Sequence, residues 1–302
     1  PFPSKNPRME KYINRRNEVL QQMAENGFID PNTLKKLAKK EVILAGKTPK
    51  TIAPSAVSDM LEEFNGVGFT DMQLFEGKVS IETSIDLRIQ EIANQALENG
   101  LRAYEKRHPE AKDQIQGAVI VLRNSDAGIL AEVGGRQTYQ SKNLAYTDFN
   151  RAKHAKRQPG SAFKPIVYLT AFRNGFTLRH LVMDGPIYLS RGKGRPPHKI
   201  GNYDNKYKGV ITVRQALAES RNAAAMWLAY RSGGIKEVLE TAQLLGINSK
   251  LELRPTTAIG ASVVNLTELA NAFRAIASGL YERPHLIKKV KDRSGEILFN
   301  RK

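Results

Sequence analysis

Hydrophobic positions in the first 45 residues recur at the spacing of amphipathic helices. A first helix is predicted to end at the Asn26-Gly27 pair, which commonly stops a helix. A second helix is predicted to begin after Asp30, because an aspartate can cap free backbone N–H groups and Pro31 suits a first turn. The Pro/Thr/Ser-rich stretch 46–59 then predicts a connector.

The pattern changes at about residue 76, where strands appear beside helices. Residues 77–86 alternate apolar and polar positions as a strand does, and residues 87–107 continue as an amphipathic helix. Residues 116–136 and 288–299 each place two apolar runs around turn-forming residues, which predicts antiparallel hairpins. Most of the chain after residue 210 has the pattern of helices. Residues 76–302 are therefore predicted to form an α+β domain.

Of the chain's length, composition and net charge, the net charge says most about its function. At 302 residues the chain has room for about two domains, and its hydrophobic content of 41% is ordinary for globular protein. A formal charge of +17 favours an anionic partner, such as a nucleic acid, a membrane surface or an acidic polymer. No nucleic-acid-reading motif accompanies the scattered basic residues, so no specific nucleic-acid partner is expected.

The cysteine and histidine content excludes several kinds of site. The chain has no cysteine, which excludes disulfides, a thiol nucleophile and thiolate metal ligands. Its five histidines lack the HExxH spacing, and neither a metal site nor a cofactor is predicted. The longest apolar runs are too short to span a bilayer, and no signal peptide opens the sequence. If the protein works at a membrane, its anchor is expected outside these residues.

Candidate chemistry appears in the stretch RQPGSAFKP, residues 157–165. Ser161 and Lys164 are three residues apart, so on a helix their side chains lie on one face, a turn apart. A serine is a weak nucleophile until a base takes its proton, and a lysine can do so only as the neutral amine, which burial favours. The apolar neighbours of Lys164 predict such burial. The pair is therefore a candidate nucleophile and base.

Spacing alone leaves another interpretation open. Ser161 could be an ordinary helix N-cap, and Lys164 could lay its stem on apolar surface while its amine reaches water. Ser190 and Lys193 repeat the S-x-x-K spacing in a Gly/Pro/basic loop, where the lysine is expected to stay solvated and protonated. Further motifs are needed to favour the catalytic interpretation.

A second candidate element is Ser220-Arg221-Asn222, between two segments with the helical pattern. The Ser220 hydroxyl could relay a proton to a leaving amine, and the Asn222 amide could hold a substrate peptide group. The alternative is a cap between two helices, since S-x-N also occurs at Ser4-Lys5-Asn6 and Ser141-Lys142-Asn143. Of the three, only the Ser220 copy follows Ser161 and lies between two helical segments.

Together these motifs resemble the transpeptidase domain of class A, bifunctional penicillin-binding proteins. That family is marked by three motifs, S-x-x-K, S-D-N and K-T-G, and this chain has two of them. The second occurs in the looser form S-x-N, with Arg221 in the middle position. The resemblance covers nearly the whole chain and is most specific around Ser161. The similar stretches are RQPGSAFKP, FNRAKHAKRQPGS, GVITVRQALAESRN, GAVIVLRNSDAGILAEVGG, AIGASVVNLTELANAFRAIASG, GKVSIETSIDLRIQEIANQAL and, for the end of a preceding glycosyltransferase domain, RRNEVLQQMAENGFID.

The resemblance implies the fold shared by penicillin-binding proteins and serine β-lactamases, an antiparallel sheet with a helical lobe. Residues 1–75 would be the tail of a glycosyltransferase domain and a linker, and residues 76–302 the transpeptidase domain. The implied partners are peptidoglycan stem peptides, a lipid-linked precursor, β-lactam antibiotics and other cell-wall synthesis proteins. The implied location is the extracytoplasmic face of a bacterial plasma membrane.

The resemblance also assigns roles to individual residues. Ser161 would be acylated by the penultimate D-Ala of a stem peptide or by a β-lactam, with Lys164 as the base. Ser220 would relay a proton, and Asn222 would hold the substrate. The acyl group would then pass to an amine on a neighbouring stem and crosslink the two.

The sequence departs from the family in two places. No K-T-G or K-S-G follows Ser220, and no EDxxFxxHxG-like glycosyltransferase segment is present. Arg231-Ser232-Gly233 and Arg293-Ser294-Gly295 are expected to be structural turns rather than replacements for the third motif. We therefore expect an incomplete sheet and a fragment truncated before its K-T-G strand, with poor acylation of residues 1–302 alone or none at all.

Two other function classes stay open at this point. The absent third motif favours a non-catalytic scaffold or muropeptide-binding module, whereas the intact Ser161, Lys164, Ser220 and Asn222 argue against it. Binding of an anionic polymer through the net charge would need no pocket. That binding would weaken steeply with salt and would be indifferent to Ser161→Ala.

Overall fold

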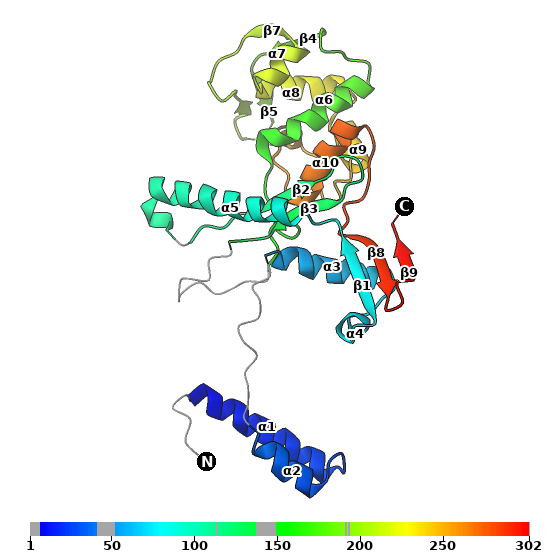
Figure 1. The fold of residues 1–302 in the computed structure, drawn as a ribbon. Helices are drawn as coiled ribbons and strands as arrows, with labels where there is room; N and C mark the ends of the chain where they lie inside the picture. The colour runs from blue at the N-terminus through cyan, green and yellow to red at the C-terminus, as the bar shows by residue number, and fades with distance from the viewer. Residues whose placement is uncertain are drawn as a thin grey trace. The chain divides into compact units, whose positions relative to one another are not determined.

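The chain forms two compact units, residues 1–51 and 52–302, whose elements are shown in Figure 1. The computed structural model describes residues 7–40, 52–112, 114–136, 149–190, 192 and 194–301, and for residues 7–12 the backbone alone. No helix among these residues combines the length and apolar character needed to cross a membrane.

The first unit is a pair of helices, α1 (Pro7–Glu25) and α2 (Pro31–Ala38), as predicted. Gly27 follows α1 with a φ of +75°, the left-handed conformation that ends a helix. Asp30 caps α2, because its carboxylate accepts from the backbone N–H groups of Asn32 at 2.8 Å and Thr33 at 3.0 Å. None of the described side chains in this unit is buried.

The second unit holds the remaining elements. Its α-helices are α3 (Pro54–Gly66), α4 (Asp71–Phe75), α5 (Leu87–Arg107), α6 (Lys164–Arg173), α7 (Val213–Ala218), α8 (Asn222–Arg231), α9 (Ile235–Leu244) and α10 (Leu266–Ser278). Its strands are β1 (Val79–Thr83), β2 (Val119–Leu122), β3 (Ile129–Val133), β4 (Leu181–Asp184), β5 (Ile187–Leu189), β6 (His198–Ile200), β7 (Gly209–Thr212), β8 (Ile287–Asp292) and β9 (Ile297–Asn300). Three short 3₁₀ helices are η1 (Pro109–Ala111), η2 (Gly160–Phe163) and η3 (Pro255–Ile259).

The strands pair antiparallel throughout the described residues. Strand β1 pairs with β8, which also pairs with β9, and β2 pairs with β3 in a separate two-stranded sheet. Strands β4 and β7 form another pair, as do β5 and β6. Both predicted hairpins, the strand within 77–86 and the helix 87–107 are therefore confirmed. The pairing of β1 with β8, more than two hundred residues along the chain, closes the unit around its core.

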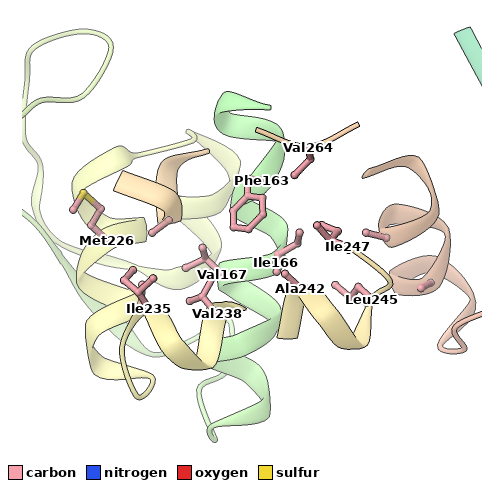
Figure 2. Close-up of a cluster of buried hydrophobic side chains, with 14 of the residues drawn as sticks. Phe163, Ile166, Val167, Met226, Ile235, Val238, Ala242, Leu245, Ile247 and Val264 are labelled. Atoms are coloured by element: carbon pink, nitrogen blue, oxygen red, sulfur yellow. The ribbon is translucent and has the colours of Figure 1, made fainter. Parts of the chain in front are cut away.

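The helical lobe is built around α6, which is buried on both sides. Figure 2 shows Ile166 and Val167 of α6 beside Val238 and Ala242 of α9. On its other side α6 contributes Tyr168 and further residues to a second buried cluster shared with α8. A helix that is apolar all round belongs in a core. This burial positions both ends of α6, including the segment that carries Ser161 and Lys164.

One sequence prediction is wrong in part. The connector predicted over 46–59 contains the first turns of α3, which begins at Pro54, while residues 46–51 lie outside the described part of the chain. Ala56, Met60 and Phe64 share one face of α3 and pack into two core clusters. Pro54 and Ser55 look like loop residues but sit in the first turn, where proline and serine are tolerated. The expected domain boundary at residue 75 stays a prediction.

The contact between α3 and β3 buries two carboxyl groups. Asp59 of α3 is 8% exposed and Glu132 of β3 is 1% exposed. The Asn150 amide donates to Glu132 Oε1 at 2.8 Å and to Asp59 Oδ2 at 3.3 Å. Burial, reinforced by the neighbouring Asp59 carboxylate, raises the pKa of Glu132 to about 7.

Candidate active site

Ser161 lies on η2, a turn of 3₁₀ helix that runs directly into α6. The predicted helix start is thus a 3₁₀ turn, and the α-helix begins at Lys164. The Ser161 side chain is exposed, whereas Phe163 is fully buried in the lobe core. The hydroxyl is therefore open to an approaching molecule while the backbone beneath it is anchored.

The loop after η3 holds this turn from the other side. The Gly160 N–H donates to the Gly260 carbonyl at 3.2 Å, and Arg157 and Val264 exchange two backbone hydrogen bonds of 2.9 and 3.0 Å. A Cβ on Gly260 would lie 2.0 Å from the Gly160 carbonyl oxygen, and Gly260 has a φ of +79°. Only glycine fits there. The sequence analysis gave Gly260 no role, although a glycine within an apolar run often marks such a close backbone approach.

Lys164 is buried, with 2% of its surface exposed. Its Nζ donates to the Ser220 carbonyl oxygen at 2.5 Å and to Ser220 Oγ at 3.0 Å. The structure therefore joins the two predicted motifs directly, through Lys164 and Ser220. Within the described residues Ser161 Oγ forms no hydrogen bond, and it lies one turn before Lys164 on the same segment.

The surroundings of Lys164 change its acidity. Burial, and in smaller measure repulsion from the nearby Arg221 guanidinium, lower the pKa of the Lys164 amine to about 8. At pH 7 a pKa near 8 leaves roughly one amine in ten neutral, against fewer than about one in a thousand for an ordinary lysine. The buried Lys164 amine is therefore a better candidate for a base than a solvated lysine would be.

Ser220 sits in the short link between α7 and α8. Its backbone has a φ of +52°, a left-handed conformation that is uncommon for a residue with a side chain. Hydrogen bonds from the Ser220 and Arg221 N–H groups to the Leu217 and Ala216 carbonyls, each 3.0 Å long, hold the link in place. This geometry directs both oxygens of Ser220 toward Lys164.

Arg221 is the central residue of a buried charge network that the sequence analysis missed. It is 5% exposed and donates to Asp184 Oδ2 and Asp204 Oδ2, both at 2.9 Å, and to the Lys206 carbonyl. The Asn202 amide donates to Asp184 Oδ1 at 2.8 Å. These partners lie 15 to 37 residues before Arg221, and no local pattern in the sequence links them to it.

Asn222 begins α8 and faces the same network. Its backbone N–H donates to Asn202 Oδ1 at 2.7 Å, and its side-chain amide donates to the Gly201 carbonyl at 2.9 Å. Asn202 therefore caps α8 from a distant part of the chain. The Asn222 side-chain oxygen accepts no hydrogen bond within the described residues.

The competing motif matches have structural explanations. Ser232 Oγ donates to the Leu228 carbonyl at 2.7 Å at the end of α8, and Ser294 lies in the turn between β8 and β9. The prediction that both segments are turns is confirmed. Ser190 is exposed, but Lys193 of the second S-x-x-K match lies outside the described residues, as do the other two S-x-N matches.

Comparisons with known proteins match this chain to penicillin-binding proteins. Penicillin-binding protein 1A of Rickettsia conorii is 34% identical over 62% of this chain and 23% of its own length. That of Aquifex aeolicus is 28% identical over 96% of this chain and 49% of its own length. The chain thus spans about half, or less, of the length of these relatives.

Solved structures share the fold. Penicillin-binding protein 1A from Haemophilus influenzae has a TM-score of 0.72 at 19% identity, covering 97% of this chain and 56% of that chain. PonA1 from Mycobacterium tuberculosis, in complex with penicillin V, has a TM-score of 0.65 at 23% identity, covering 82% of this chain and 65% of that chain. The family model for the penicillin-binding protein transpeptidase domain matches residues 117–302, more than half of the chain. The chain belongs to the penicillin-binding protein transpeptidase family, and its α+β fold is the one predicted from the sequence.

Proposed function

We propose that this chain carries the acyl-serine D,D-transpeptidase chemistry of a bifunctional peptidoglycan synthase. Ser161 is the nucleophile, Lys164 its base, Ser220 the proton relay and Asn222 a substrate-holding residue. The observation that carries the proposal is the buried Lys164 amine, whose pKa is lowered to about 8 and which is hydrogen-bonded to Ser220.

The hydrogen bonds of Lys164 suit a base. A neutral amine has two N–H donors and one lone pair, and Ser220 offers two acceptors through its carbonyl and its hydroxyl. With both donors used, the lone pair is left to accept the proton of the Ser161 hydroxyl. The alternative of a capping serine followed by a lysine that reaches water does not fit an amine buried to this extent.

Acylation then involves two proton transfers, one to Lys164 and one from Lys164 to the leaving amine. Lys164 takes the Ser161 proton as Oγ attacks the carbonyl carbon of the penultimate D-Ala, and the C–N bond to the terminal D-Ala breaks. The proton passes from Lys164 through the Ser220 hydroxyl to the departing amine, leaving an acyl ester on Ser161. An amine from a second stem attacks this ester, returns its proton along the same path and leaves a new amide.

The remaining parts of the proposal concern the whole protein. The Asn222 side-chain oxygen accepts an N–H of the bound stem peptide. A β-lactam acylates Ser161 in place of the stem, and the implied acyl donor is carried on lipid-linked glycan. Residues 1–75 are the closing helices of a glycosyltransferase domain and a linker. The enzyme works at the extracytoplasmic face of a bacterial plasma membrane, in company with other cell-wall synthesis proteins.

Fluorescent penicillin followed by peptide mass mapping tests the proposal. Residues 1–302 are expected to form a Ser161 adduct, about a hundredfold to a thousandfold more slowly than a domain with the K-T-G strand, because that strand supplies part of the oxyanion hole. Ser161→Ala should abolish the adduct. The matched control is Ser190→Ala, which removes the exposed serine of the other S-x-x-K match and should label like the parent.

The same experiment decides between catalysis and binding alone. A folded protein that never acquires an adduct, at saturating penicillin and long incubation, leaves the non-catalytic scaffold as the function. An adduct that persists in Ser161→Ala would place the nucleophile elsewhere.

A further inference from the structure

A charged cavity lies outside the candidate active site. Its volume is about 500 Å³, and it is lined by residues of α3, β3 and α10 and by the segments that precede α10 and β8. It includes the buried contact between Asp59 and Glu132 and extends to Glu62 and Lys153. The proposed acylation chemistry uses none of these residues.

Three of the side chains in this region are arranged as metal ligands would be. Asp59, Glu62 and His154 each offer one ligand atom, and the three atoms lie within 4.8 Å of one another. Ligand atoms about 2.1 Å from a tetrahedral ion lie about 3.4 Å apart, so small rotations would bring all three atoms to bonding distance of one ion. Glu62 and His154 are exposed and free to make them, whereas buried Asp59 supplies a fixed point.

Glu132 is a second indication of a ligand. It is 1% exposed, Oε1 accepts from Asn150, and Oε2 has no donor among the described residues apart from the carboxyl pair that Glu132 forms with Asp59. A buried carboxylate oxygen without a donor costs about 1–3 kcal/mol or more. Since Glu132 lines the same cavity as Asp59 and Glu62, the structure offers the orphaned oxygen a position that a bound group can satisfy.

Lys153 shows that the cluster attracts a cation. Its Nζ lies 2.5 Å from Glu62 Oε2 and 3.4 Å from Asp59 Oδ2. One ammonium faces three carboxyl groups, those of Asp59, Glu62 and Glu132. The Lys153 side chain is 35% exposed, so it can swing into solvent when another cation takes its place.

We propose that Asp59, Glu62 and His154 bind a transition-metal dication of the Zn²⁺ class, and that Lys153 occupies the site in its absence. Carboxylates combined with an imidazole suit such an ion better than Mg²⁺ or Ca²⁺, which prefer oxygen ligands alone. The fourth position is a water molecule that donates to Glu132 Oε2. The ion ties α3 to the segment leading into Ser161, yet the inference does not depend on the acylation chemistry.

Calorimetric titration of Zn²⁺ into the chelator-treated chain tests the site. We expect saturable binding of one ion, and at least a tenfold loss of affinity in Glu62→Gln and in His154→Ala. Both residues are exposed, so both variants should keep the parent melting curve. In Lys153→Met the affinity should rise about tenfold, because no ammonium competes with the ion. A parallel titration with Ca²⁺ should show much weaker binding.

The chain supplies a matched control for ordinary surface binding. His108 Nδ1 lies 3.2 Å from Glu110 Oε1 in an exposed pair of the same two residue types. His108→Ala with Glu110→Gln should leave the Zn²⁺ affinity unchanged. Absence of saturable binding, or binding lost only in this control variant, overturns the proposal. An affinity that stays the same or falls in Lys153→Met would contradict the exchange of ion for ammonium.

Discussion

Two carboxyl groups, Asp184 in the helical lobe and Glu132 at the contact of β3 with α3, are equally buried but differ in their partners. Asp184 is 0% exposed and both its oxygens are matched, Oδ1 by Asn202 and Oδ2 by Arg221 Nε and the Lys208 N–H. Glu132 is 1% exposed and has one oxygen without a donor.

The difference shows how a buried charge can be used. Both oxygens of Asp184 accept hydrogen bonds. The hydrogen bond from Arg221 to Asp184 fixes the guanidinium beside the strained link that contains Ser220. Arg221 in turn helps to lower the pKa of Lys164. Around Glu132 the partners are incomplete, and burial together with the neighbouring Asp59 carboxylate raises the pKa of Glu132 to about 7. The first region keeps a fixed charge for positioning, whereas the second is open to a proton or a cation.

The largest effect is expected for Lys164→Met, which removes the proposed base and keeps the apolar stem. Acylation of Ser161 should slow by about 10²- to 10⁴-fold. At pH 7 the free energy of unfolding should rise by about 1–3 kcal/mol, since the fold no longer buries a partly protonated amine. Lys236→Met, at a position whose side chain is 81% exposed, should change neither quantity. Lower stability in Lys164→Met would contradict the account.

The pH dependence of that gain has a definite sign. The Lys164 pKa falls from 10.5 in the unfolded chain to about 8 in the fold, so between these values the unfolded chain binds more protons. The parent protein should therefore gain stability relative to Lys164→Met as pH rises from about 8 to 10.5. Urea unfolding of both proteins between pH 8 and 10.5 measures this, and the difference between their free energies of unfolding should become smaller as pH rises.

A second effect concerns the matched carboxylate. Asp184→Asn should lower the free energy of unfolding by about 3–5 kcal/mol, because Arg221 stays buried with half of its counter-charge removed. Asp204→Asn removes the exposed partner of the same arginine and should lower the free energy of unfolding far less, because solvent screens that ion pair. Denaturant unfolding at pH 7 compares them. Equal losses of unfolding free energy in the two variants would show that the burial of Asp184 does not add to its effect on stability.

The smallest effect is expected for the unmatched carboxylate. At pH 8 Glu132→Gln should leave the free energy of unfolding unchanged or raise it by up to about 2 kcal/mol, since it removes a poorly partnered charge of the same shape. Glu91→Gln, on the exposed face of α5, serves as the baseline. If Glu132→Gln lowered the free energy of unfolding as much as Asp184→Asn does, the proposed difference between the two carboxyl groups would be contradicted.

Local pattern was sufficient to predict many elements of this fold. The Asp30 cap, strand β1, helix α5 and both hairpins follow from spacing and turn residues within short windows. The S-x-x-K and S-x-N spacings likewise identified Lys164 and Ser220, which the structure brings into contact. Helix α3 was missed in part because its first turn has the composition of a loop.

The rest depends on contacts between distant parts of the chain. Asp184 and Asn202 lie far from Arg221 and Asn222 in the sequence and meet them in a fold where β4 pairs with β7, and Gly260 meets Gly160 across about a hundred residues. The proposed cation site joins positions 59, 62 and 154, so no HExxH-like spacing could have predicted it. Such partners can be found only once the chain is folded.

The central claim is that the buried Lys164 amine is a base near neutral pH. The direct measurement is an NMR titration of the lysine side chains in residues 1–302, with the Lys164 signal identified by its loss in Lys164→Met. The account predicts a midpoint near pH 8, well below that of the exposed lysines. A midpoint near 10.5, shared with the exposed lysines, would contradict it.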